Sequence, residues 1–250
     1  MKKTGFLVSA SYVRTGWHLI RARGLKRYVL APLLINLLLF TALGWWAYTI
    51  AGDWLQSFSV FQQWGDWWIV NAVETLLRWI VLLVLVFALT YLFTLLANLI
   101  AAPFNGLLAE RVEAHLTGKR LPDTGGWSAH IKNVPRLIGS ELSKLLYLIL
   151  CMLPLLLLHF IPVVNLVAPL LLFLFGAWMF ALEYLDYPMG NHGAVFREVR
   201  QQLRKNRSAA FGFGTAVAVL SMVPLINLII MPVAVAGATA LYVDQLRFSS

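Results

Sequence analysis

Long apolar runs divide the sequence into predicted membrane spans and polar connections. Residues 31–51 form an uninterrupted apolar run of about the 20 residues that a helix needs to cross a bilayer core. A second apolar run covers residues 79–102 and is expected to end at Pro103, because proline disrupts a helix interior. The segment between them, residues 52–78, combines tryptophan with acidic side chains and is assigned to the outer side of the membrane. The pattern therefore predicts two long transmembrane helices.

The C-terminal half contains an internal repeat built on the pattern Pro-x-x-Asn. The two asparagines are Asn165 and Asn227, and each is flanked by apolar arms. Proline ends helices and asparagine favours turns, so each copy predicts a helical hairpin. The hairpins are expected over residues 143–186 and 209–244.

The arms of the second hairpin are short for a membrane span. Residues 209–222 and 228–242 reach only about 21 to 23 Å at about 1.5 Å per residue, against a hydrocarbon core of about 30 Å. We therefore expect the hairpins to penetrate the membrane only part-way, with protein or water covering the backbone of their turns. The alternative is that the hairpins cross completely as four ordinary spans, which gives six spans in total.

The N-terminal segment, residues 1–30, is basic and amphipathic. It carries seven Lys and Arg residues and no acidic residue. Phe6, Val13, Trp17 and Ile20 recur at near-helical spacing. This pattern predicts a surface helix that lies on the inner leaflet.

Two later segments are also assigned to the inner face. Residues 103–142 are polar and are expected to form a cytoplasmic segment with a short amphipathic helix that begins near Pro135. Residues 187–208 contain five basic residues and only one acidic residue, Glu198. This segment is predicted to be a basic inner-face helix that attracts anions or contacts anionic lipids.

Composition and charge agree with a multi-pass, all-α integral membrane protein. Of the 250 residues, 60% are hydrophobic and 12% are charged, and the mean hydropathy is +0.75. Of the 20 Lys and Arg residues, only Arg78 lies in the outer segment, which leaves 19 on the inner side. The positive-inside rule therefore explains the net charge of +9, and no nucleic-acid partner is expected.

A basic, glycine-hinged loop precedes the first span and is the strongest candidate for a binding site. Gly24 and Leu25 allow backbone N–H groups to converge, and the first turn of the following helix adds unpaired N–H groups and a positive dipole end. Lys26 and Arg27 supply full charges at the same place. These residues predict an oxyanion site at the mouth of a membrane path. The alternative is the commoner role of a positive flank that only sets topology.

A second group of polar residues follows the second span. Glu110 and Glu113 share one helix face beside Arg111. The favoured interpretation is a solvated face with ordinary ion pairs. The alternative is that Glu110 and Arg111 belong to a pore or polar network together with Asn165 and Asn227.

Familiar catalytic motifs are absent from the sequence. It contains no phosphate-binding P-loop, dinucleotide fingerprint, zinc-protease motif or nucleophile elbow. Five scattered histidines and one cysteine do not suggest a metal site. An enzyme, an ATP-driven pump or a bound cofactor is therefore not expected. The predicted spans hold almost no ionisable residue, so a proton-relay transporter lacks its usual signature.

These features together resemble the CysZ family of bacterial sulfate permeases. The resemblance rests on the loop at residues 24–27, the Pro-Phe-Asn to Glu-Arg-Val segment at 103–112, the Glu-Tyr-Leu-Asp-Tyr-Pro stretch at 183–188 and both Pro-x-x-Asn hairpins. It implies two long transmembrane helices, two pairs of partly penetrating helices, and assembly into homo-oligomers, either dimers or a hexamer. It also implies a location in the bacterial inner membrane, in contact with lipid.

The resemblance also implies a sulfate-binding site. In this chain the family's glycine-leucine-basic loop maps to Gly24, Leu25, Lys26 and Arg27, and Lys26 stands where family members often have an arginine. The expected function is channel-like sulfate uptake that feeds sulfur assimilation and cysteine biosynthesis. The alternatives are a structural or lipid-organising membrane protein and a proton-coupled anion symporter.

Overall fold

A computed structural model describes residues 5–22, 24–57, 67–119 and 126–247 of the chain. Every regular element within these ranges is a helix, and no strand occurs among them, so the all-helical prediction is confirmed. Five helical segments in the described ranges are long and apolar enough to cross a membrane: Lys26–Trp46, Trp68–Phe93, Gly139–Phe160, Ala168–Asn191 and Ile229–Leu246.

The chain divides into two compact units. The smaller unit is Leu30–Pro103, and it holds most of α2 (Lys26–Ser57) and the first part of α3 (Trp68–Thr117). Large apolar side chains on both helices, such as Leu38 on α2 and Phe87 on α3, are exposed. Exposed apolar surface on this scale suits a lipid environment.

Helix α3 continues through Pro103, where the sequence analysis expected a break. The helix runs for 50 residues from Trp68 to Thr117 without interruption. Proline is tolerated in membrane helices when neighbouring groups satisfy the freed backbone carbonyl. The boundary between the two compact units nevertheless falls at this proline, because Phe104 begins the part of α3 that belongs to the larger unit.

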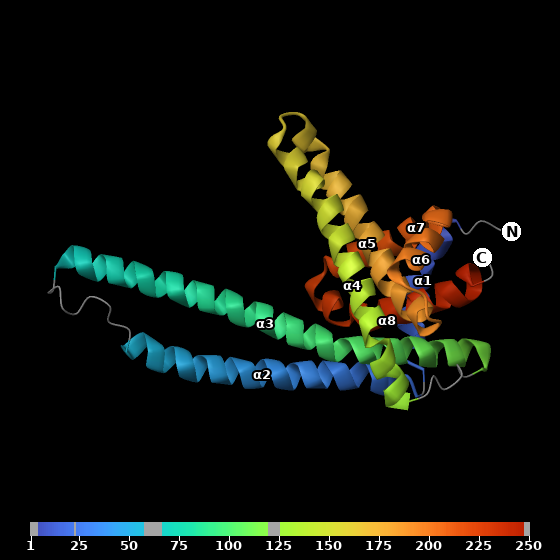
Figure 1. Cartoon of the computed structure of the whole chain (residues 1–250), viewed down its shortest axis with the longest axis horizontal. Coiled ribbons are helices and arrows are strands. Elements are labelled where there is room, and N and C mark those ends of the chain that lie inside the picture. The colour runs from blue at the N-terminus through green and yellow to red at the C-terminus, as the bar shows by residue number, and fades with distance from the viewer. Residues whose placement is uncertain (1–4, 23, 58–66, 120–125, 248–250) are drawn as a thin grey trace. The chain divides into compact units, whose positions relative to one another are not determined.

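The larger unit, Met1–Val29 with Phe104–Ser250, is built around α8 (Pro224–Leu241). Nearly every side chain of α8 after Ile230 is buried. The helices packed against it are α1 (Phe6–Leu19), α5 (Ala168–Asn191) and α7 (Arg207–Ser221), which lie together in Figure 1. This cluster is the core of the unit.

Helix α1 packs against α7 and α8 through one face, and most of the apolar stripe predicted from the sequence lies outside that face. Its buried residues are Ser9, Tyr12, Val13 and Gly16, so Val13 alone of the predicted apolar stripe is fully buried. Small residues at this face let the backbones approach closely. The Tyr12 hydroxyl donates a hydrogen bond to Asp244 over 3.1 Å, and burial raises the pKa of this phenol.

The closest approach between α1 and α8 occurs at Gly16. A methyl group added there would overlap the carbonyl oxygen of Val233 and the backbone of Gly237. We expect Gly16→Ala to destabilise the protein by about 1 to 3 kcal/mol, because two helix backbones would have to separate. Gly176→Ala is the matched control, since a methyl group on that α5 glycine meets nothing within 4 Å. Equal thermal melting temperatures of the two variants in detergent would contradict this packing.

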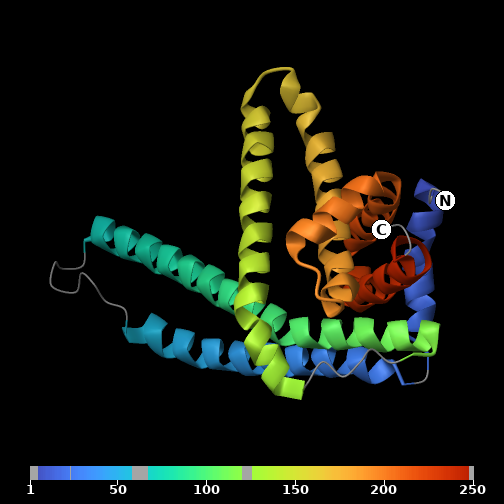
Figure 2. The ribbon, with the colours of Figure 1, turned by 45° about the vertical axis from the view of Figure 1, so that its right-hand side comes forward.

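Helices α4 (Gly126–Leu157) and α5 form an antiparallel hairpin, which Figure 2 shows clearly. Two single 3-10 turns, η2 (Leu158–Phe160) and η3 (Val164–Leu166), make the connection. Helix α4 is continuous from Gly126, where the sequence analysis expected a separate short helix near Pro135. The amphipathic segment and the apolar arm are therefore one helix.

Two short helices and a second hairpin complete the larger unit. The basic segment forms α6 (Phe196–Lys205), and α7 meets α8 at a tight turn over residues 222–223. A π-helical turn, η4 (Tyr242–Leu246), follows α8. Helix α7 has only 15 residues and is not among the five candidate spans. The depth to which either hairpin enters a bilayer stays a prediction.

Candidate functional site: a basic loop and two buried ion-pair clusters

The basic loop turns sharply into the first residues of α2. Gly24 has a φ of +91°, in the left-handed region that glycine adopts without a steric penalty. The Leu25 side chain is only 4% exposed, which anchors the loop, whereas Lys26 and Arg27 are exposed. The Tyr28 N–H donates to the Leu25 carbonyl over 3.1 Å. The loop thus buries its apolar residue and presents its two cations outward.

Tyr28 links this loop to the end of α3. The Arg27 guanidinium lies 4.9 Å from the centroid of the Tyr28 ring and donates a hydrogen bond to its hydroxyl over 3.1 Å. The Arg111 guanidinium lies 5.9 Å from the same ring. Two arginines distant in sequence therefore flank one tyrosine. The Nε of Arg111 is buried and has no hydrogen-bond partner among the described residues.

The charges of this cluster are not compensated locally. Within the described part of the chain, no carboxylate forms an ion pair with Lys26, Arg27 or Arg111. The Leu25 N–H donates to the Ala22 carbonyl over 3.2 Å, whereas the N–H groups of Lys26 and Arg27 have no partner among the described residues and lie at the positive end of the α2 dipole. Cationic side chains beside such a helix start suit an oxyanion, which accepts charge-assisted hydrogen bonds. We call Lys26, Arg27 and Arg111 the basic cluster.

Glu113 belongs to a buried ion-pair cluster, not to the solvated face that the sequence analysis favoured. The residue is only 2% exposed. Its Oε2 lies 2.9 Å from Nε2 of His192, and its Oε1 accepts a hydrogen bond from Nη1 of Arg247 over 3.2 Å. A buried carboxylate needs such partners, because an unpaired one is costly. The cluster joins the end of α3 to the ends of α5 and η4.

A second buried cluster surrounds Lys144 on α4. Its Nζ lies 3.0 Å from carboxylate oxygens of Glu141 and Glu183 and 3.2 Å from Oδ2 of Asp186. Asn105 donates a hydrogen bond to the neighbouring Tyr187 hydroxyl over 3.3 Å. These contacts hold α4 and α5 together at the end of the hairpin that lies away from its connecting turn. They place four ionisable groups inside segments that are long and apolar enough to span a membrane.

The sequence analysis did not predict several of these interaction partners. His192 and Arg247 were not predicted as partners of Glu113, and Lys144 was not predicted as a charged centre. The one available signal was the Glu-Tyr-Leu-Asp stretch at residues 183–186, whose two carboxylates share an otherwise apolar segment. Carboxylates in such a setting require a cation.

The remaining predicted polar residues are not joined to the basic cluster. Asn165 lies in η3 at the tip of the α4–α5 hairpin, and Asn227 lies in the first turn of α8. Both are exposed. No hydrogen bond among the described residues connects either of them, or Glu110, to Arg111. Of the predicted network, the structure places only Arg111 beside the basic loop.

Comparison with known proteins decides the family. A sequence model described as Sulfate transporter CysZ/Etoposide-induced protein 2.4 matches residues 12–232 of the chain. The chain belongs to this family. A relative from Pectobacterium atrosepticum, named Sulfate transporter CysZ, is 45% identical over 238 residues, which cover 94% of this chain and 84% of the relative. The family predicted from the sequence is thereby confirmed.

The family match covers most of the features described above. It includes the basic loop, Arg111, Glu113, Lys144 and the prolines of both hairpins up to Pro232, whereas Arg247 lies beyond it. The basic cluster and the Lys144 cluster therefore lie wholly within the matched residues, whereas the Glu113 cluster extends beyond them at Arg247.

Proposed function

We propose that the protein moves sulfate across the bacterial inner membrane as a channel-like permease that feeds sulfur assimilation and cysteine biosynthesis. The observation that carries this proposal is the basic cluster, three cations without a described carboxylate partner. Lys26 and Arg27 lie at the start of a candidate span, and Arg111 lies beside Tyr28 in the first turn of the same helix. The relative from Pectobacterium atrosepticum, whose name states sulfate transport, supports the same substrate. The proposal requires no enzymatic step and no cofactor.

In this proposal Lys26, Arg27 and the backbone N–H groups of Gly24 and of the first residues of α2 form the cytoplasmic mouth of the path. Leu25, whose N–H donates to the Ala22 carbonyl, anchors the loop. Sulfate carries two negative charges and accepts hydrogen bonds through four oxygens, so fixed cations and amides replace part of its hydration shell. A conducting site must also release its ion. The exposure of Lys26 and Arg27 suits weak binding, with a Kd between millimolar and micromolar, or roughly −4 to −8 kcal/mol.

We further propose that the protein acts as a homo-oligomer. Non-helical turns lie just before two asparagines, at residues 161–163 before Asn165 and at residues 222–223 before the helix that holds Asn227. Each uncovered polar group within a bilayer costs several kcal/mol. If the hairpins enter the membrane part-way, neighbouring protomers must cover these turns. Native mass spectrometry in mild detergent should therefore show dimers or hexamers, and a population of monomers alone would contradict this assembly.

Sulfate flux tests the transport proposal. Radiolabelled sulfate should enter liposomes that contain the purified protein faster than it enters protein-free liposomes of the same lipid. A structural or lipid-organising role predicts equal uptake in both preparations. A proton-coupled symporter predicts uptake that responds to an imposed pH gradient, whereas a channel-like permease predicts uptake that is indifferent to it.

A further inference from the structure

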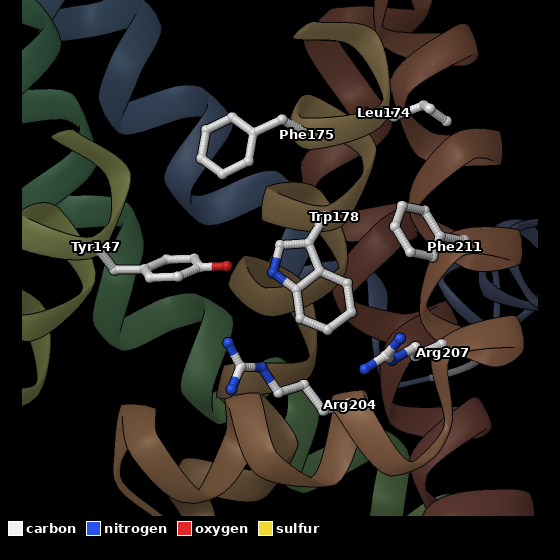
Figure 3. Close-up of a pocket in the computed structure, with 7 residues that line it drawn as sticks. All are labelled: Tyr147, Leu174, Phe175, Trp178, Arg204, Arg207 and Phe211. Carbon is white, nitrogen blue, oxygen red and sulfur yellow. The ribbon is translucent and has the colours of Figure 1, made fainter. Parts of the chain in front are cut away.

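An open pocket of about 310 Å³ lies in the larger unit, where α4, α5, α6 and α7 meet (Figure 3). Its apolar walls come from Leu174 and Phe175 of α5 and Phe211 of α7. The pocket contains no residue of the basic cluster or of either ion-pair cluster. The proposed transport function therefore leaves it unexplained.

Polar groups gather at one side of this pocket. Arg204 of α6 and Arg207 of α7 line it, and neither forms an ion pair with a described carboxylate. Arg200 adds a third cation nearby, with its guanidinium 5.0 Å from the centroid of the Tyr147 ring. Figure 3 shows the Tyr147 hydroxyl, the indole nitrogen of Trp178 and the Arg204 guanidinium on the same side.

Trp178 supplies a buried donor. The residue is 8% exposed, and its Nε1 is buried without a hydrogen-bond partner among the described residues. A buried indole N–H usually finds an acceptor, because leaving it unpaired costs about 1 to 3 kcal/mol. Neither an arginine nor a second N–H donor can accept this hydrogen bond. Among the lining side chains only the Tyr147 hydroxyl can accept it, and a bound anion would offer further acceptor oxygens to both groups.

We infer that this pocket binds the phosphate group of an anionic phospholipid. Guanidinium groups pair with phosphate oxygens through two parallel hydrogen bonds, so Arg204 and Arg207 suit the phosphodiester. A phosphate oxygen can also accept a hydrogen bond from the indole N–H of Trp178. The apolar wall of Phe175 and Phe211 suits the start of an acyl chain, which a free inorganic anion would leave unused.

The position of the pocket along the α4–α5 hairpin favours a lipid. Between the start of α5 at Ala168 and Trp178 the helix rises about 15 Å, roughly half of a 30 Å hydrocarbon core. The corresponding part of α4 beyond Tyr147 exposes large apolar side chains, among them Leu150 and Leu153. A hairpin that enters one leaflet therefore brings Arg204 and Arg207 to the level of the lipid phosphates. Tyrosine and tryptophan are enriched at that level.

Lipid retention tests this inference on the full-length protein. The protein would be reconstituted in an equimolar mixture of phosphatidylglycerol and phosphatidylcholine, released into mild detergent, and the retained lipid measured by native mass spectrometry. The double variant Arg204→Gln/Arg207→Gln should retain about tenfold less phosphatidylglycerol than the parent, since it loses charge-assisted hydrogen bonds. The matched control Arg197→Gln/Lys205→Gln removes two exposed charges of α6 outside the pocket and should retain as much as the parent.

Two further arms complete the test. Trp178→Phe keeps the aromatic wall and loses only the donor, so it should show a smaller loss of phosphatidylglycerol than the double arginine variant. Millimolar inorganic phosphate or sulfate should not displace the lipid. Equal phosphatidylglycerol retention by the two double variants would overturn the inference. Displacement of the lipid by the free anions, or no preference over phosphatidylcholine, would also overturn it and assign the pocket to a free oxyanion or to nonspecific lipid contact.

Discussion

Replacing Lys144 by alanine is expected to lower the free energy of unfolding by about 3 kcal/mol, because three carboxylates would lose their shared cation. The Lys144 side chain is only 10% exposed, and that of Asp186 is 19% exposed. The side chains of Glu141 and Glu183 are more exposed, so water screens part of the repulsion among the carboxylates. The expected loss of unfolding free energy is therefore at the low end of the range for removing one partner of a buried ion pair. Thermal unfolding in detergent, followed by circular dichroism, measures the loss.

A second variant separates the lost charge from the lost side-chain volume. Lys144→Met/Asp186→Asn removes one charge of each sign and keeps an unbranched chain in the same space, so it should be more stable than Lys144→Ala. Replacing two members of one cluster gives non-additive effects, which reveals their coupling. The control is Lys205→Ala, which removes an exposed lysine of α6. A melting temperature of Lys144→Ala equal to that of Lys205→Ala would show that the cluster does not stabilise the hairpin.

Replacing Arg27 by alanine is expected to weaken sulfate binding about tenfold, the usual loss when a charged hydrogen-bond donor is removed. Arg27 is exposed and stacked on Tyr28, so its guanidinium is oriented before an anion arrives. Arg27→Lys should bind with intermediate affinity, because it keeps the charge and loses the planar fork. Isothermal titration with sulfate in detergent measures the affinities.

Arg111 extends this prediction to a residue on another helix. Arg111→Ala removes the second guanidinium from the Tyr28 ring and should weaken sulfate binding less than Arg27→Ala does, since its Nε is buried. The matched control is Arg14→Ala, which removes an exposed arginine of α1 on the same predicted side of the membrane. If Arg14→Ala weakens binding as much as Arg27→Ala, then general positive charge, and not the loop, attracts the anion.

Features with strong local signals were predicted from the sequence. The apolar runs and composition led to an all-helical membrane protein, and the glycine in the basic loop has the positive φ that a sharp turn requires. The family was also predicted, because the loop and the Pro-x-x-Asn repeats are local patterns. Each of these signals depends on residues that are neighbours in the chain.

Features that depend on tertiary contacts were missed. Proline ordinarily ends a helix, yet α3 continues through Pro103. The packing of α1 against α7 and α8, through a face that includes Ser9 and Gly16, was not predicted, because the sequence indicated only a surface helix. The environment of Glu113 is set by His192 and Arg247, more than 70 residues away in sequence. No periodicity within one helix can reveal such partners.

The most direct measurement is radiolabelled sulfate uptake by liposomes that contain the Lys26→Ala/Arg27→Ala variant, beside the parent and Arg14→Ala. Insertion and oligomeric state are first shown to match the parent, so that altered topology does not explain the result. If the basic loop forms the mouth of a sulfate path, the double variant takes up sulfate at least about tenfold more slowly than the parent, and Arg14→Ala matches the parent. Parent-like uptake by the double variant would show that the loop only orients the chain in the membrane.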